Sequence, residues 1–141
     1  MLELIYQITA LDIYCRDAHY SFRGIDYKPL HEWMDEISDP LDDFLDEIKE
    51  SILLRSNNEV PRGVEINANA AFYVPSEVGE SNREILSNVQ AVIMMCHQTI
   101  NGMKDMSVGN GDILGRIDSH LDKHLGLLRL ALEEKNVKKV D

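Results

Sequence analysis

Proline and glycine are scarce in this chain of 141 residues, which has four prolines and eight glycines. Because both residues interrupt helices, long stretches without them favour a helical protein. Aromatic residues make up only 6% of the chain, but apolar residues make up 44%, which excludes wholesale disorder and is enough for one core. We therefore expect residues 1–141 to form a single all-α domain.

Long apolar runs and a basic leader are also missing. The longest apolar runs are as short as Val92 to Cys96, so we expect no membrane-spanning segment. The start of the chain carries Glu3 in place of the basic region typical of a signal peptide. The two cysteines, Cys15 and Cys96, lie on apolar stripes, which favours buried free thiols over a disulfide. We expect a cytoplasmic protein.

Positive charge is scarce as well. Lysine and arginine together number 14 against 25 aspartates and glutamates, which gives a formal net charge of -11. An acidic protein has no electrostatic attraction to DNA or to an anionic membrane, but it attracts cations. Cationic ligands are therefore more compatible with this composition than nucleic acid.

Apolar residues recur every three or four positions along four segments, which is the spacing of helices packed in a bundle. The first segment starts at Leu4, and Gly24 is expected to take the left-handed conformation directly after it. The second should run from Pro29 to about Arg55. We favour one bent helix over two separate helices there, because the apolar stripe keeps its phase across Pro40.

The connection from Ser56 to Pro75 is long for a compact domain, and it would allow the second and third helices to run parallel. Ala68 to Tyr73 is expected to form a short helix within it. Ser81 and Glu84 have the spacing of a capping box that opens the third helix. The sequence therefore predicts a four-helix bundle with a long crossover between helices two and three. Its fourth helix should be capped by Asn110 or Asp112 and should fray in residues 136–141.

Two groups of side chains between residues 19 and 50 carry the chemistry of transition-metal binding, since imidazole with carboxylate suits iron, manganese or zinc. We call His19, His31 and Asp35 the histidine half-site, and Asp46 and Glu50 the carboxylate half-site. Successive members are 12, 4, 11 and 4 residues apart. An interval of four puts two side chains one turn apart on the same helix face.

Helix geometry separates the two half-sites. Around the axis of the second helix, at 100° per residue and with His31 at zero, the other predicted ligands lie at about 40° to 100°. The apolar stripe of the same helix is centred near about 265°. The ligands therefore point away from the core. His31 and Asp46 are also separated by roughly 22 Å along the helix, too far to share one ion. Two antiparallel helices across a two-fold axis would unite the half-sites of different chains, twice per dimer.

The alternative is that these acids form only a solvated surface. Nine acidic residues lie between Glu32 and Glu50, so some of them fall four residues apart without any function. His120 and His124 are also four residues apart, and without a further partner we interpret them as structural. Trp33 and Tyr20, near the predicted ligands, more often pack than react.

The chain resembles the miniferritins called Dps, the DNA-binding proteins from starved cells. The match comprises His19-Tyr20-Ser21-Phe22-Arg23-Gly24, then Tyr27, His31, Asp35, Asp46 and Glu50, and continues at Asp122-Lys123-His124-Leu125 and Leu127-Leu128-Arg129. Members of this family are ferritin-like four-helix bundles that assemble as hollow dodecamers. They oxidise ferrous iron, usually with hydrogen peroxide, and store ferric mineral.

The resemblance implies a ferroxidase and iron-storage protein that uses hydrogen peroxide or oxygen and protects the cell against oxidative damage. By motif match, iron is bound and oxidised by the histidine half-site of one chain and the carboxylate half-site of its neighbour, at two-fold interfaces. Asp112 matches the pore aspartate of the family, and Asp105 is a weaker candidate. A solvated or helix-capping acid is the alternative for both.

The chain departs from the family pattern in several places. Tyr20 stands where a tryptophan is usual, and the tryptophan of the last helix is replaced near Gly126. Tyr20 and Trp33 keep an aromatic electron donor next to the predicted site, and Pro40 is unusual for the second helix. The lysine-rich N-terminal tail that many members use to bind DNA is missing. A DNA-binding nucleoid shell protein with little iron chemistry is the alternative function.

Overall fold

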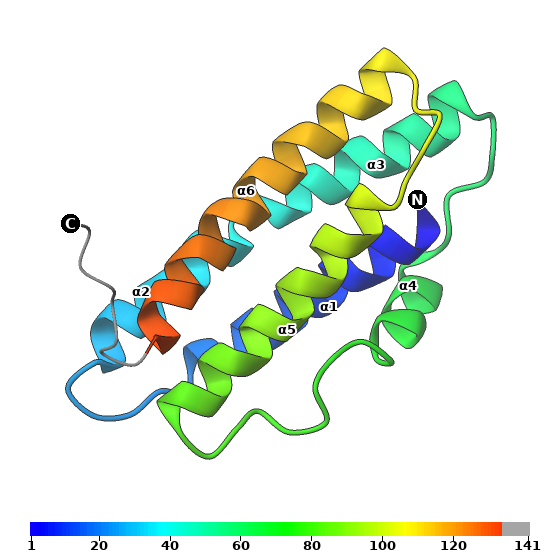
Figure 1. Ribbon diagram of the computed structural model, residues 1–141. Coiled ribbons are helices and arrows are strands. Elements are labelled where there is room, and N and C mark those ends of the chain that lie inside the picture. Colours follow the sequence, from blue (N-terminus) through cyan, green and yellow to red (C-terminus); the bar gives the residue numbers. More distant parts are fainter. Residues whose placement is uncertain (134–141) are drawn as a thin grey trace, which may run out of the picture.

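Helices make up the regular structure of residues 1–133, the part of the chain described by the computed structural model (Figure 1). They are α1 (Leu2–His19), α2 (Tyr27–Ser38), α3 (Leu41–Arg55), α4 (Gly63–Ala70), α5 (Asn82–Asn101) and α6 (Val108–Leu132). No strand occurs among these residues, so the all-α prediction is confirmed for them. The fraying expected in residues 136–141 lies outside the described part.

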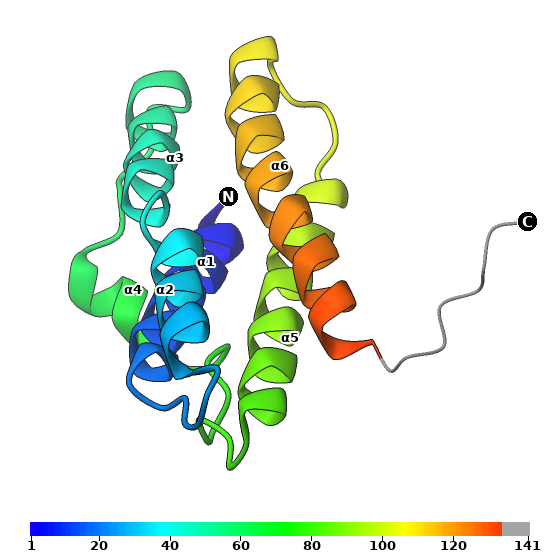
Figure 2. The same ribbon diagram turned by 90° about the vertical axis from the view of Figure 1, so that its left-hand side faces the viewer.

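Four helical rods lie lengthwise beside one another: α1, the α2–α3 pair, α5 and α6 (Figure 1, Figure 2). The crossover returns the chain to the far end of the rods, so α2–α3 and α5 run in the same direction, as its length predicts. The short helix of the crossover is α4, which packs on α1. It lies earlier than the predicted Ala68 to Tyr73, because buried Ile66 and Ala70, one turn apart, fix its position.

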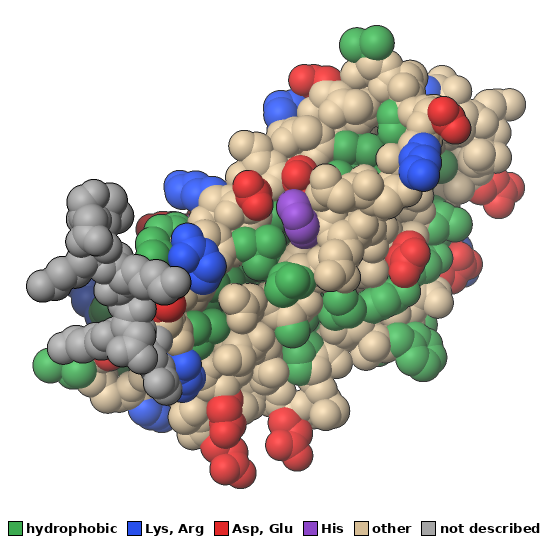
Figure 3. All heavy atoms as spheres, viewed as in Figure 1, with side chains coloured by type: hydrophobic (Ala, Val, Ile, Leu, Met, Phe, Trp, Pro, Cys, Tyr) green, Lys and Arg blue, Asp and Glu red, His purple; other side chains and the backbone are tan. Residues whose placement is uncertain are grey.

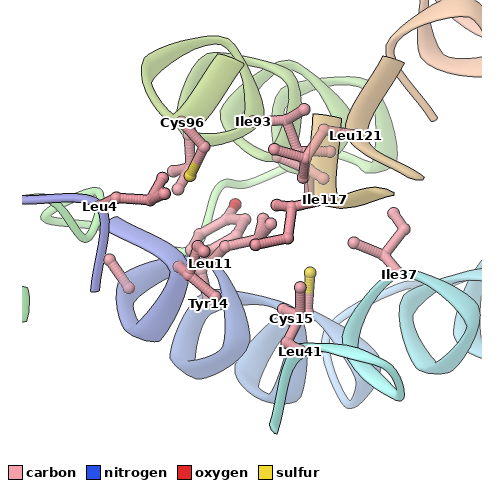
Figure 4. Packing of buried hydrophobic residues seen from close by; sticks show 14 of the residues in the cluster. Leu4, Leu11, Tyr14, Cys15, Ile37, Leu41, Ile93, Cys96, Ile117 and Leu121 are labelled. Atoms are coloured by element: carbon pink, nitrogen blue, oxygen red, sulfur yellow. The ribbon is translucent and has the colours of Figure 1, made fainter. Parts of the chain in front are cut away.

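The four rods share one apolar core, in which side chains from every rod point toward one another (Figure 4). Its buried members in that view include Leu4, Leu11, Tyr14, Cys15, Ile37, Leu41, Ile93, Cys96, Ile117 and Leu121. Both cysteines are free and buried, as predicted. Burial raises the pKa of Cys15 above its usual range and that of Cys96 to about 12, so neither thiol is reactive at neutral pH.

Serine side chains open the two long helices α5 and α6. Ser81 accepts a hydrogen bond from the Glu84 N–H at 3.1 Å, which confirms the predicted cap of α5. Ser107 accepts a hydrogen bond from the Asn110 N–H at 3.2 Å and caps α6. The prediction of Asn110 or Asp112 as this cap is wrong, because Ser107 already starts the helix upstream of both.

The loop between α1 and α2 is fixed to the start of α5. The Arg23 N–H donates to Asn82 Oδ1 at 3.0 Å, and Asn82 Nδ2 donates to the Arg23 carbonyl at 2.7 Å. Gly24 has φ +85°, the left-handed conformation expected of it. It lies within this loop, however, and not directly after α1, which ends at His19 with Tyr20 as its C-cap.

The second predicted helix is divided at Asp39 and Pro40, so the preference for one continuous bent helix is wrong. Proline has no N–H to continue the helical hydrogen bonds. Both residues nevertheless keep right-handed helical dihedral angles, which explains why the apolar stripe keeps its phase. His120 Nε2 of α6 donates to the Ile37 carbonyl at 2.9 Å, and so gives a carbonyl of the last α2 turn a partner.

Replacement of His120 by leucine should lower the free energy of unfolding by about 1 to 2 kcal/mol, because the Ile37 carbonyl loses its donor. In a Pro40→Ala background the loss should be smaller, because a continuous helix would bring the Leu41 N–H into hydrogen-bond reach of the Ile37 carbonyl. Denaturant unfolding at fixed protein concentration measures both effects. An equal loss in the two backgrounds would contradict the bracing role of His120.

Candidate metal site

The end of α1 and the second turn of α2 bring two histidines into contact. The rings of His19 and His31 are stacked with centroids 3.4 Å apart and an interplanar angle of 27°. His19 Nδ1 lies 3.0 Å from the His31 carbonyl oxygen, and His31 Nδ1 lies 2.7 Å from the His19 carbonyl oxygen. Because a carbonyl oxygen only accepts hydrogen bonds, each Nδ1 carries the hydrogen. Each Nε2 therefore keeps a lone pair for a metal.

Asp35 completes the histidine half-site. Its Oδ1 lies 3.2 Å from His19 Nδ1, so its carboxylate shares that N–H with the His31 carbonyl. The Asp35 side chain is 55% exposed, and its remaining oxygen lone pairs are accessible. The half-site borders an open cleft of about 420 Å³ lined by Arg16, His19, Tyr20, Asp35, Ser38, Asp39 and Asp42. The structure thus unites the three residues predicted to belong to one chain.

The aromatic residues near the half-site differ in position. Tyr20 lies edge-on to the His19 ring at 5.0 Å, and its side chain is exposed. The Trp33 indole N–H instead donates to His124 Nδ1 at 3.0 Å, across the bundle on α6. The expectation that Trp33 lies beside the ligands is wrong, because positions two apart on a helix differ by about 200°.

The carboxylate half-site lies on α3 and does not meet the histidine half-site of the same chain. Asp46 borders a cleft with Pro40, Asp43, Phe44, Glu47 and Arg116. Glu50 borders a second cleft, of about 230 Å³, which Asp112 also lines. Within residues 1–133, no three His, Cys, Asp or Glu side chains are arranged to hold a metal ion. The two half-sites are therefore separate within one chain, as helix geometry predicts.

Arg116 is the charged residue of this region that the sequence interpretation missed. Its guanidinium donates two hydrogen bonds of 2.9 Å to the Glu47 carboxylate, and its Nε lies 3.3 Å from Asp112 Oδ2. The bond to Glu47 is the main reason that the pKa of Arg116 is raised. Of these contacts, only the one between Asp112 and Arg116 could have been predicted from the sequence, because the two residues are four apart on one helix.

His120 and His124 have structural partners, in agreement with their interpretation as structural residues. His124 is 2% exposed and accepts the hydrogen bond from Trp33. Burial lowers the pKa of His124 to about 4, with smaller contributions from His120 and Lys123. The ring is therefore uncharged at neutral pH, when its Nδ1 lone pair is available to Trp33.

The face of α5 and α6 shows acidic, basic and apolar side chains interspersed (Figure 3). Among the described residues on that face, no continuous basic patch is visible. His97 Nδ1 donates to Asp118 Oδ1 at 2.7 Å between these two helices, a pair that the sequence interpretation did not identify.

Comparison of the chain with protein-family models, with curated proteins and with solved structures finds no match. The resemblance to the miniferritins therefore rests on the motif residues and their spacing. In the described part of the chain, no helix combines the length and the apolar character needed to cross a membrane.

Proposed function

We propose that this protein is a ferroxidase and iron-storage miniferritin with a ferritin-like four-helix bundle. The observation that carries the proposal is the histidine half-site. Residues 12 apart in the sequence stack their rings, and backbone carbonyls hold both Nδ1 hydrogens. This arrangement leaves two Nε2 lone pairs, and the Asp35 carboxylate lies 3.2 Å from His19 Nδ1. Imidazole and carboxylate are ligand types suited to ferrous iron. The parallel α2–α3 and α5 rods and the short helix in the crossover also support the ferritin-like bundle.

Iron oxidation suits this mixture of ligands. Neutral imidazole binds ferrous iron, whereas hard anionic carboxylates stabilise the ferric product. Two ferrous ions supply the two electrons that reduce one hydrogen peroxide to water, and oxygen is the other candidate oxidant. Iron is thus the substrate and the stored cargo.

Assembly belongs to the proposal because neither half-site has enough ligands alone. The site would form at a two-fold interface where the histidine half-site of one chain meets the carboxylate half-site of another, within a dodecamer. Leu53 supports such an interface. It lies two turns after Asp46 on the same face of α3, and its apolar side chain is 54% exposed.

Iron entry through an acidic pore is a further part of the proposal. Asp112 lies in the second turn of α6, is exposed, and lines the same cleft as Glu50. A cation that enters at Asp112 would therefore reach Glu50 within one cleft. DNA binding is not included, because the net charge of -11 per chain would be multiplied around a shell.

The pure protein, mixed with ferrous iron and hydrogen peroxide, should oxidise the iron faster than buffer does and keep the ferric product in solution. Absorbance of ferric iron follows the rate. Gel filtration with iron analysis shows whether the mineral elutes with an assembly of about twelve chains. An assembled protein that neither oxidises nor retains iron would refute the ferroxidase proposal, and a monomer would refute the two-chain site.

A further inference from the structure

Helix α3 presents more carboxylates than the proposed site uses. Glu47 lies three residues before Glu50, so the two share one face of α3, and it lines the same cleft as Asp46. Residue type and spacing alone do not distinguish Glu47 from the two predicted ligands. Its contacts do.

Both carboxylate oxygens of Glu47 are occupied by one cation. Arg116 Nη1 donates to Oε2 and Nη2 to Oε1, each at 2.9 Å, which is the two-bond geometry that fixes a carboxylate most firmly. Asp46 and Glu50 have no hydrogen bond or ion pair from any side chain in residues 1–133. Among the described residues, Asp46 and Glu50 therefore have no side-chain partner, whereas Glu47, which lies between them in the sequence, is held by Arg116.

Arg116 is shared by the two clefts that the carboxylate half-site borders. It lines the cleft that contains Asp46 and also the cleft that contains Glu50. A fixed positive charge at this point repels an incoming divalent cation and withholds Glu47 from it. Loss of Arg116 would therefore add one negative group and remove one positive group at the same place.

We propose that Arg116 is a positioning residue that holds Glu47 away from iron and so limits α3 to two ligating carboxylates. This inference rests on the proposed ferroxidase function. A site that turns over must release its ferric product to the mineral, and Glu47, as a third carboxylate from α3 and the fourth of the site, would retain that product. Arg116 thus favours turnover over tight binding.

A purely stabilising role gives a different expectation. The side chains of this pair are 46% and 35% exposed, and exposed ion pairs contribute little to folding. Metal affinity and stoichiometry are therefore the informative measurements. Unfolding experiments serve only to show that each variant is folded.

The test titrates the assembled protein with Co²⁺, a divalent probe that peroxide-free buffer does not oxidise, by isothermal calorimetry. Arg116→Gln should bind Co²⁺ about tenfold more tightly or bind one more ion per chain, because a charged group is lost and Glu47 is released. Adding Glu47→Gln to this variant should restore wild-type binding. The Co²⁺ affinity of Arg116→Lys should fall between those of the wild type and Arg116→Gln, since an ammonium does not hold both carboxylate oxygens in a planar fork.

Arg129→Gln is the matched control. It removes another exposed pair on α6, Arg129 with Glu133 at 3.4 Å, and should bind Co²⁺ like the wild type. Arg116→Gln with unchanged binding would overturn the inference. A gain that survives Glu47→Gln would also overturn it, and would assign the effect to Asp112, the other partner of Arg116.

The inference and the proposed function can fail separately. Wild-type protein that oxidises iron, with unchanged Co²⁺ binding in Arg116→Gln, would refute the role of Arg116 and leave the ferroxidase intact. Wild-type protein that oxidises no iron, with a Glu47-dependent gain of Co²⁺ binding, would refute the ferroxidase and keep the control of Glu47 by Arg116.

Discussion

Equal amounts of His31→Ala and Glu50→Ala chains, refolded together, should recover about a quarter of the wild-type iron-oxidation rate. Each variant alone should lose activity by at least the roughly 10- to 100-fold that disturbed metal surroundings cost. In a mixed dimer, one interface combines both defects. The other combines an intact histidine half-site with an intact carboxylate half-site. About half of random pairs are mixed, and half of their sites are intact.

A second mixture provides the control for this complementation. His31→Ala and Asp35→Ala both damage the histidine half-site, so every site in their mixture lacks one ligand. This mixture should recover no activity. Ferric absorbance, normalised to the amount of assembled protein, measures both mixtures. Absence of recovery in the first mixture, with assembly intact, would contradict a site shared between chains.

Acidification from pH about 6.5 to about 4 should cost the folded protein about 2 to 3 kcal/mol through His124 alone. The pKa of His124 is about 4 in the folded chain, mainly because of burial, against an ordinary value of 6.5. Between these values the unfolded chain binds a proton that the folded chain does not. Stability therefore falls as the pH falls through this window, and His124 has no effect above it.

The His124→Gln variant isolates this contribution, because a glutamine amide does not titrate and its oxygen still accepts the Trp33 indole hydrogen. Urea unfolding of both proteins at several pH values, at one protein concentration, gives the two stability profiles. The difference between them should shrink on acidification. Parallel profiles would show that His124 does not limit acid stability.

Local periodicity predicted the parts of this fold that depend on neighbours in the sequence. The apolar stripes predicted the rods, and the long connection after Arg55 predicted that α3 and α5 run parallel. The division at Pro40 was not predicted, because the two residues there stay helical and the stripe continues. The cap of α6 was misplaced because the glycines at 109 and 111 suggested a later start, and Ser107 was not among the residues considered.

In the candidate site, too, some contacts were predicted from the sequence and others, between residues far apart in the chain, were not. The match to the family motif predicted that His19 and His31 act in one chain, and in the structure their rings stack within one chain. The partner of Glu47 lies 69 residues away, and the partner of Trp33 lies 91 residues away. Periodicity carries no information about such partners, because it reports which face a residue occupies and not what packs against it.

The exchange of hydrogen bonds between His19 and His31 makes the two ligands independently replaceable. The Nδ1 hydrogen of each ring is held by the backbone carbonyl of the other residue, and the two rings also stack. In a His19→Ala chain the carbonyl that accepts from His31 Nδ1 remains, so the surviving imidazole keeps this hydrogen bond and its Nε2 lone pair. A substitution of one histidine side chain therefore removes one proposed ligand and leaves the Nδ1 hydrogen bond of the other in place. A lineage could change its metal preference one histidine at a time.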